Sequence, residues 1–379
     1  MQTEILTATA DGQWARRSPI ADADLVIYFG ARHRMVEHDW HAQLQRLHPR
    51  AIVIGCSTGG QIVGDRIVDQ EMTAAALKFE ATPIRLFRGR IDSAEASRAT
   101  GEAIGWSLDG GDLAGILVLS DGLNVNGSEL VAGIAASTPP HVRIAGGLAG
   151  DGERFETTLV DAGEGPKPGA IAAIGFYGNR IRIGFGSGGG WDAFGPHRRI
   201  TKACGNVLAE IDGKPALELY DRYLGDEAAG MPGTALLFPL SICDPAQRGH
   251  EVVRTVLGID RTRGTMTFAG DMPTGWWAQL MRGQFHRLAE SAADAARQAE
   301  IDTAGDRLSI LISCTGRRLL MGQRITEELS AAQRGLGDGS HTIGFYSYGE
   351  ISPHPDSGLP QLHNQTMTVM QLGEAGTVP

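Results

Sequence analysis

The sequence alternates between two kinds of segment, and this alternation restricts the fold more than any other feature. Short runs of Val, Ile, Leu and Phe, each bounded by Gly, Pro or Asp, predict β-strands. Segments with apolar residues along one helical face lie between some of these runs. The predicted strands are residues 24–30, 51–54, 73–79, 115–120, 157–161, 170–176, 181–185, 234–242, 251–259, 308–313, 342–348 and 366–372. The predicted helices are residues 37–48, 93–108, 128–136 and 275–300.

Strands and helices in this order predict an α/β fold of the mixed α+β type, in which helices flank mixed sheets. The 52 glycines are about twice the usual share of ~7%, which indicates many tight turns. A chain of 379 residues, at roughly 100–200 residues per domain, is typical of two domains. The segment 225–233 has the weakest signals for regular structure. We therefore expect one domain over residues 24–218 and a second over residues 219–373.

Charge and cysteine spacing exclude several classes of protein. Lys and Arg number 34 and Asp and Glu number 44, so the formal charge is −10, and nothing predicts the basic stripe that a nucleic-acid binder needs. No signal-peptide pattern opens the chain, and no apolar run of ~18 residues predicts membrane insertion. Cys56, Cys204, Cys243 and Cys314 are far apart and form no Cys-x-x-Cys pair. We therefore expect reduced thiols in a cytoplasmic protein.

A turn of small residues follows the second predicted strand. Residues Gly55-Cys56-Ser57-Thr58-Gly59 match G-x-S-x-G, the pattern that exposes a nucleophilic serine at a strand end. Two features oppose a hydrolase, because a β-branched pair follows in place of a helix and no His lies nearby in sequence to activate Ser57 or Cys56. In a second interpretation, the N–H groups and hydroxyls of the turn line a ligand cleft, and in a third the turn is purely structural. We predict Cys56, Ser57 and Thr58 as ligand-binding residues and keep a hydrolase using Ser57 or Cys56 as the alternative.

Three other segments contain related patterns. Residues 308–316 run from an apolar strand into Cys, Thr and Gly, much as residues 51–59 do. The match is short enough to arise by chance, so it leaves an internal duplication open. Two glycine-rich stretches, 146–152 and 184–190, lack the Gly-Lys-Ser/Thr of a phosphate-binding loop. Neither stretch predicts a nucleotide site.

Polar residues gather on two predicted strands near the end of the chain. Tyr346, Tyr348 and Glu350 are spaced by two, so one continuous strand would place them on the same face. A buried carboxylate needs a partner, and converging polar groups beside aromatic surface are typical of a ligand site. His363 and Asn364 enter the last predicted strand. We predict that these five residues bind a ligand, and the alternative is an internal hydrogen-bond network.

Taken together, these segments resemble the FIST family, a bacterial and archaeal sensory module with an N-terminal and a C-terminal FIST domain. The matching residues follow one another in order along almost the whole chain. They are Ile54-Gly-Cys-Ser-Thr58, Gly146-Gly-Leu-Ala-Gly-Asp151-Gly, Thr201, Asp212-Gly-Lys-Pro-Ala216, Phe238-Pro-Leu, Gly344-Phe-Tyr-Ser-Tyr-Gly-Glu-Ile351 and His363-Asn-Gln-Thr366. The family usually continues its front motif as Ala-Gly-Glu, whereas this chain has Gly59-Gly60-Gln61 and lacks that acidic group.

The resemblance implies a sensory protein that binds a small ligand, such as an amino acid. It also implies a separate signalling partner, such as a histidine kinase or a cyclic-dinucleotide signalling protein. One subgroup resembles haem proteins that respond to nitric oxide, which implies haem with an axial histidine. The candidate haem ligands are His341 and His363. A hydrolase and a scaffold without a ligand are the other two hypotheses.

Overall fold

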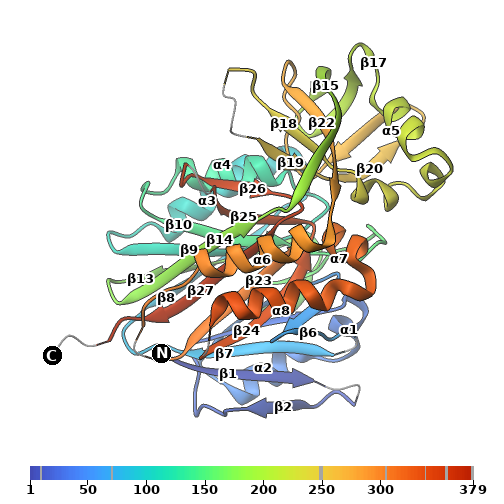
Figure 1. Ribbon diagram of the computed structural model, residues 1–379. Helices are drawn as coiled ribbons and strands as arrows, with labels where there is room; N and C mark the ends of the chain where they lie inside the picture. Colours follow the sequence, from blue (N-terminus) through green and yellow to red (C-terminus); the bar gives the residue numbers. More distant parts are fainter. Residues whose placement is uncertain are drawn as a thin grey trace.

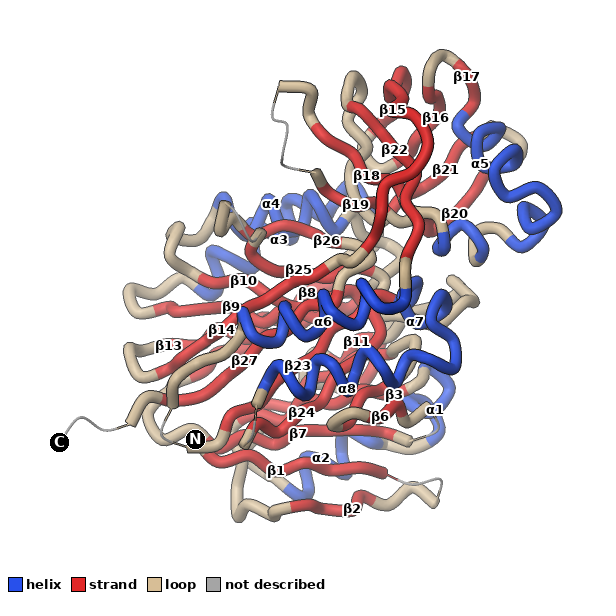
Figure 2. The backbone as a smooth tube through the Cα atoms, in the orientation of Figure 1, coloured by secondary structure: helices blue, strands red, loops and turns tan. Residues whose placement is uncertain are grey.

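The computed structural model describes residues 1–8, 11–69, 71–246, 251–303, 305–337, 339–354 and 357–376. Its strands form four sheets within these ranges, and helices cover the outer faces of three of them (Figures 1 and 2). This arrangement confirms the predicted mixed α/β fold. Three sheets form a large body, and residues 191–283 form a smaller unit above it in Figure 1, called the lobe below.

The first body sheet has the strand order β12-β11-β4-β3-β7-β1-β2. Its strands are β1 (Gln2–Ala8), β2 (Trp14–Arg17), β3 (Leu25–Gly30), β4 (Ile52–Ser57), β7 (Met72–Lys78), β11 (Val160–Asp161) and β12 (Pro166–Lys167). The helices α1 (Arg32–Glu37) and α2 (Trp40–Leu47) cover its outer face. Strand β3 is buried on both faces, because Tyr28 packs with Trp40 on the helix side while Ile27 and Phe29 face the interior.

The second body sheet has the order β26-β25-β10-β9-β13-β8. Its strands are β8 (Ile84–Arg90), β9 (Leu113–Ser120), β10 (Arg143–Leu148), β13 (Ala170–Tyr177), β25 (Gly349–Pro353) and β26 (Pro360–His363). The helical segments η1 (Ala94–Ala96), α3 (Ser97–Leu108) and α4 (Gly127–Ala136) lie on its outer side. Helices α3 and α4 pack closely, since a Cβ at Gly101 would lie 2.2 Å from the Leu130 carbonyl oxygen.

The third body sheet has the order β14-β27-β23-β24-β5-β6. Its strands are β5 (Gln61–Val63), β6 (Arg66–Ile67), β14 (Ile181–Gly188), β23 (Arg307–Cys314), β24 (Ser340–Ser347) and β27 (Met367–Glu374). Its helical segments are α6 (Phe285–Gln298), α7 (Thr315–Met321), η4 (Gly322–Arg324) and α8 (Ile325–Leu336). All three sheets enclose one apolar core, in which Phe29 and Phe345 stack with their ring centroids 4.6 Å apart.

The lobe has its own sheet and its own apolar core around Tyr220, Leu240 and Phe268. Its strands are β15 (Trp191–Cys204), β16 (Val207–Ile211), β17 (Lys214–Pro215), β18 (Leu240–Cys243), β19 (Val252–Arg254), β20 (Val256–Asp260), β21 (Thr265–Phe268) and β22 (Trp277–Gly283). Its helical segments are α5 (Ala216–Leu224), η2 (Gly225–Gly230) and η3 (Thr234–Leu237).

One predicted helix is wrong over its first part. Residues 275–300 contain strand β22, and α6 begins only at Phe285. The apolar residues of this segment fit a helical stripe, but Ala278 and Leu280 also alternate as in a strand. Pairing with β15 and β18 on both sides decides in favour of the strand.

The expected boundary near residue 219 falls inside α5, and strands from both halves of the chain share three of the four sheets. The division into domains at residues 218 and 219 stays a prediction. Among the helices of the described residues, none combines the length and apolar character needed to cross a membrane.

Candidate functional site

Parallel strand pairs in the body sheets end close to one another. Strands β3 and β4, β9 and β10, and β23 and β24 are the parallel pairs, one in each body sheet. Backbone hydrogen bonds join the ends of these strands: the Gly59 N–H donates to the Tyr346 carbonyl at 2.9 Å, and the Gly150 N–H donates to the Ser57 carbonyl at 2.9 Å. The carboxyl ends of parallel strands are a common place for ligands.

An open groove of about 690 Å³ lies at this position, and it is called the groove below. The loop after β4, the loop after β10 and helix α7 after β23 all contribute to its lining. The lining residues used in the argument are Gly59, Asp69, Gly152, Arg154, Thr315 and Arg318. Three segments singled out in the sequence thus meet in the groove. They are the small-residue turn 55–59, the glycine stretch 146–152 and residues 308–316, which resemble residues 51–59.

Arg318 is the central cation of the groove. Its guanidinium donates to the Gly59 carbonyl and, at 2.6 Å, to the Asp69 carboxylate. The same guanidinium lies 5.5 Å from the ring centroid of Tyr346. The side chain of Asp69 is 47% exposed. An acidic group of a ligand can therefore replace Asp69 as the partner of Arg318, because the displaced Asp69 carboxylate is already partly in solvent.

A second arginine, Arg154, lines the groove. Arg154 donates to the buried Asp151 carboxylate at 2.9 Å, and this hydrogen bond raises the pKa of Arg154. Glu153, next to it, also lines the groove. The lining therefore carries both signs of charge together with glycine backbone, which suits a small polar ligand.

Two glycines allow the front loop to approach α7 closely. A Cβ at Gly59 would lie 2.8 Å from Thr315 Oγ1, and a Cβ at Gly60, whose φ is +149°, would overlap the guanidinium of Arg318. Gln61, where the family usually has an acidic residue, is buried and donates to the Glu71 carbonyl at 2.9 Å. The loop is thus shaped by contact with α7.

The residues predicted in the front turn are buried beneath the groove. Ser57 Oγ donates to the Gly150 carbonyl and accepts from the Leu159 N–H, both at 2.9 Å. Thr58 Oγ1 accepts from the Tyr346 N–H at 3.0 Å, so it fixes β4 to β24. Cys56 packs in the central core, and burial raises the pKa of its thiol. Ser57 and Cys56 thus lack the exposure and the activating base that a nucleophile requires.

The expectation that Tyr346, Tyr348 and Glu350 share one face of a continuous strand is wrong. Strand β24 ends at Ser347 and β25 begins at Gly349 in a different sheet. Tyr346 consequently packs under α6 and α8, whereas Tyr348 stacks on Phe155 and donates to the Gly152 carbonyl at 2.9 Å. Polar residues spaced by two indicate a strand, but this spacing does not show where one strand ends and the next begins in another sheet.

Glu350 is buried in a local polar network. Its Oε1 lies 2.5 Å from Ser347 Oγ, and its Oε2 accepts from the Thr366 N–H at 3.2 Å and from Thr366 Oγ1 at 3.0 Å. Burial raises the pKa of Glu350 to about 8, although the nearby Arg317 opposes the shift. These contacts match the internal network that was the alternative to a ligand site, and a binding role for Glu350 stays a prediction.

His363 and Asn364 lie on the side of the body that faces the lobe. Asn364 Oδ1 accepts from the N–H of Thr255 in the lobe at 3.2 Å. His363 Nε2 is 3.2 Å from the Ser352 carbonyl, its ring stacks 6.1 Å from that of His354, and burial lowers its pKa to about 4. Neither residue lines the groove.

The two candidate haem ligands do not fit haem. His341 is partly exposed and lies 3.8 Å from Asp306, while His363 is packed against His354 with its Nε2 held by Ser352. An axial ligand needs an open apolar cavity beside its ring. The described ranges also contain no group of three or more His, Cys, Asp or Glu side chains arranged to hold a metal ion.

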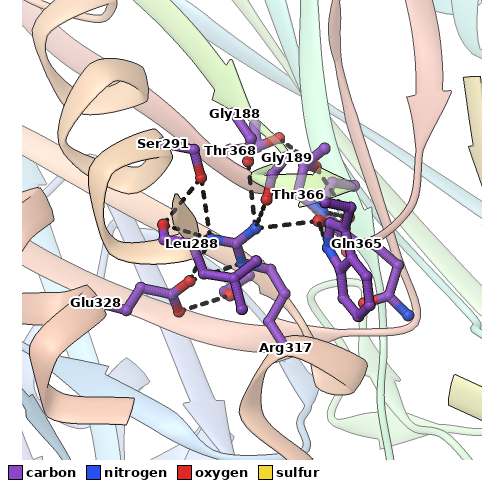
Figure 3. Close-up of polar contacts among 12 residues, drawn as sticks. Gly188, Gly189, Leu288, Ser291, Arg317, Glu328, Gln365, Thr366 and Thr368 are labelled. Atoms are coloured by element: carbon purple, nitrogen blue, oxygen red, sulfur yellow. Dashed lines mark hydrogen bonds and ion pairs between the residues drawn. The ribbon is translucent and has the colours of Figure 1, made fainter. Parts of the chain in front are cut away.

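The sequence interpretation missed the arginines that follow β23. Arg317 is fully buried, pairs with the buried Glu328, and donates to backbone carbonyls from several segments (Figure 3). Arg318 lines the groove. The similarity of residues 308–316 to residues 51–59 could have indicated these arginines. Both segments end at the groove, and Arg317 and Arg318 directly follow the second one.

Comparison with known proteins gives the family of the chain. The FIST N domain matches residues 24–214, and the FIST C domain matches residues 216–353. An uncharacterized protein of the archaeon Methanocaldococcus jannaschii is 26% identical over 204 residues, which is 49% of this chain. The match spans 38% of the length of that relative. With both domain matches covering the chain from residue 24 to residue 353, this protein belongs to the FIST family.

Proposed function

We propose that this protein is a sensor that binds a small polar ligand in the groove and passes the signal to a separate protein. The observation that carries the proposal is that the loop after β4, the loop after β10 and helix α7 line one groove, with Arg318 and Arg154, at the carboxyl ends of parallel strands. Membership of a sensory family supports it. A histidine kinase or a cyclic-dinucleotide signalling protein is the partner class that the family resemblance favours.

Calorimetric titration with a panel of free amino acids and small carboxylates tests the site. We expect Arg318→Gln and Arg154→Gln each to weaken binding by about tenfold, since a charge-assisted hydrogen bond contributes roughly 1.5–3 kcal/mol. Glu350→Gln and His363→Ala are matched controls away from the groove and should leave affinity unchanged. The reverse pattern would return the site to the C-terminal polar residues and refute the groove.

Two finer versions of the function have their own tests. Haem-based sensing of nitric oxide stays a prediction that His341 and His363 do not favour, and a Soret band in the purified protein would restore it. The hydrolase alternative requires Ser57 or Cys56 to react with a fluorophosphonate or iodoacetamide probe. We expect neither residue to be labelled in the folded protein, because both side chains are fully buried.

A further inference from the structure

The lobe is joined to the body through two connections that lie side by side. The chain enters the lobe from β14 through Gly189 and Gly190, and it returns from β22 into α6 through Gln284. Trp191 and Gly283 are paired across β15 and β22. These two strands run side by side from the body into the lobe (Figure 1). Any change at these two connections therefore acts on the orientation of the whole lobe.

Arg317 holds both connections. Its guanidinium donates to the Gly189 carbonyl on the entering side and to the Leu288 carbonyl, at 2.9 Å, on the returning side (Figure 3). It also donates to the Gln365 carbonyl at 3.1 Å, and the Glu328 carboxylate neutralises its charge. A buried ion pair offsets the cost of desolvating both charges only when its geometry and its further hydrogen bonds are good, so these contacts are sensitive to the position of Arg317.

Helix α7 contacts the lobe through a second route. A Cβ at Gly316 would lie 2.4 Å from the side-chain amide of Gln365, so α7 packs directly on that residue. Gln365 Nε2 donates to the Leu236 carbonyl in η3 of the lobe at 2.8 Å, and the backbone carbonyl of Gln365 accepts from Trp191 Nε1 at 2.9 Å. Helix α7 also contacts η3 itself.

The junction between lobe and body is polar and incompletely paired. Within the described residues, Asn364 Nδ2, Gln365 Oε1 and Thr255 Oγ1 are buried there and have no hydrogen-bond partner. Polar interfaces between units of one chain commonly allow relative motion, so two arrangements of this junction can be close in free energy.

We propose that α7 couples the groove to the orientation of the lobe. Arg318 and Arg317 are adjacent, so their side chains leave α7 about 100° apart, one toward the groove and one toward the connections of the lobe. A ligand that draws Arg318 away from Asp69 shifts α7 and, with it, the contacts of Arg317. The inference rests on the proposed function, because it names the route by which binding becomes a signal.

The test compares the lobe position in the ligand-free full chain. Cys204 is an exposed cysteine of the lobe, whereas Cys56, Cys243 and Cys314 are buried, so a spin label placed on Cys204 and on Ser107→Cys in α3 reports the distance between lobe and body. We expect Arg318→Gln and Asp69→Asn each to shift or broaden this distance distribution. Amide exchange at residues 188–191 and 284–291 should become about tenfold faster.

The matched control is Arg154→Gln, which also removes an arginine of the groove but does not lie on α7. It should leave the distance distribution and the amide exchange unchanged. An unchanged lobe in both Arg318→Gln and Asp69→Asn, or an equal response to Arg154→Gln, would overturn the coupling. Since no ligand is used, a lobe that responds while no panel compound binds would remove the proposed function and keep the coupling.

Discussion

At the scale of single residues, Ser57 shows how a nucleophile-like pattern can serve structure. Its hydroxyl links the loop after β10 to the segment before β11, donating to the Gly150 carbonyl and accepting from the Leu159 N–H. The glycines around it permit these backbone approaches. A G-x-S-x-G pattern is informative about catalysis only when a helix follows and a base is within reach.

Replacement of Ser57 tests this structural role. We expect Ser57→Ala to lower the free energy of unfolding by about 1–3 kcal/mol, because the buried Leu159 N–H loses its acceptor. Urea denaturation measures this change. The exposed Ser107→Ala is the control and should stay within about 0.5 kcal/mol of wild type. Ester hydrolysis that disappears in a folded Ser57→Ala protein would contradict the structural role.

Glu350 predicts a pH dependence of stability. Its pKa is raised to about 8 by burial, above the ordinary value near 4.5, so the folded protein holds a proton that the unfolded chain releases. This contribution is complete below pH 4.5 and is lost as the pH rises toward 8, at up to about 1.4 kcal/mol per pH unit. Urea denaturation at several pH values measures the slope.

The variant Glu350→Gln separates this carboxyl from the other titrating groups. Its amide has no proton to lose, so we expect the fall in stability between pH 5 and pH 8 to become shallower than in wild type. His363 acts in the opposite direction. Its pKa is lowered by burial, so the unfolded chain takes up a proton more readily and the free energy of unfolding decreases as the pH falls. A slope identical in both proteins would show that Glu350 titrates normally.

At the scale of elements, the glycine stretch in β14 is a surface for helix packing. A Cβ at Gly184, Gly186 or Gly188 would lie within 2.2 Å of a carbonyl oxygen of the facing chain. For Gly186 and Gly188 those oxygens belong to Ala295 and Ser291 of α6. The spacing of two places the glycines on one face of the strand, so the glycine-rich stretch allows the facing backbone to pack closely on β14.

A pair of alanine substitutions tests this packing. Gly186→Ala should destabilise the protein by about 1–3 kcal/mol or more, because its Cβ would lie 1.8 Å from the Ala295 carbonyl and the helix backbone must move. Gly189→Ala is the control, since its nearest neighbouring atom is 4.0 Å away, and it should be nearly neutral. Equal melting temperatures for the two variants would contradict the packing argument.

The elements best predicted from sequence were those whose partners lie on both faces. Strand β3 is apolar throughout and was predicted almost to its ends, because a doubly buried strand leaves a continuous apolar run. Residues 277–283 are predicted as helix, because their apolar residues fit both the helical period of 3.6 and the strand period of two. Only the pairing with β15 and β18 makes this segment a strand. The break at Tyr348 was missed because a strand that changes sheets keeps the same alternation.

At the scale of the molecule, the lobe is an insertion with its own core, and this predicts that it can be removed. Asp192 and Arg282 are paired across β15 and β22. A two-residue Asn-Gly turn between them, in place of residues 193–281, therefore closes the chain as a hairpin. We expect the remaining body to melt cooperatively at a lower temperature, because the junction residues become exposed.

Circular dichroism and calorimetry measure this outcome. The full chain under the same conditions is the control, and it should melt at the higher temperature because its junction residues stay covered. A body without the lobe that aggregates or melts without cooperativity would show that the lobe is part of one folding unit.

The groove could be located in part from sequence, but its charged residues could not. The loop after β4 was predicted because a strand ending in small polar residues is a local signal. Arg318 is 259 positions from Gly59, and their contact arises only when the first and third sheets pack on the same core. A single sequence does not indicate a contact between residues so far apart, such as Gly59 and Arg318, unless the segments around them resemble each other.

The position of β27 has a consequence for how the protein is made. This strand, Met367–Glu374, lies between β23 and β14, and β14 is an edge strand of the third sheet. The ribosome delivers β5, β6 and β14 first, then the whole lobe, then β23 and β24, and it delivers β27 only after all the other strands of the sheet. The lobe can fold during synthesis, since its strands pair within one continuous segment. The third sheet must wait for β27, so its apolar faces remain open to chaperones until that strand has been synthesised.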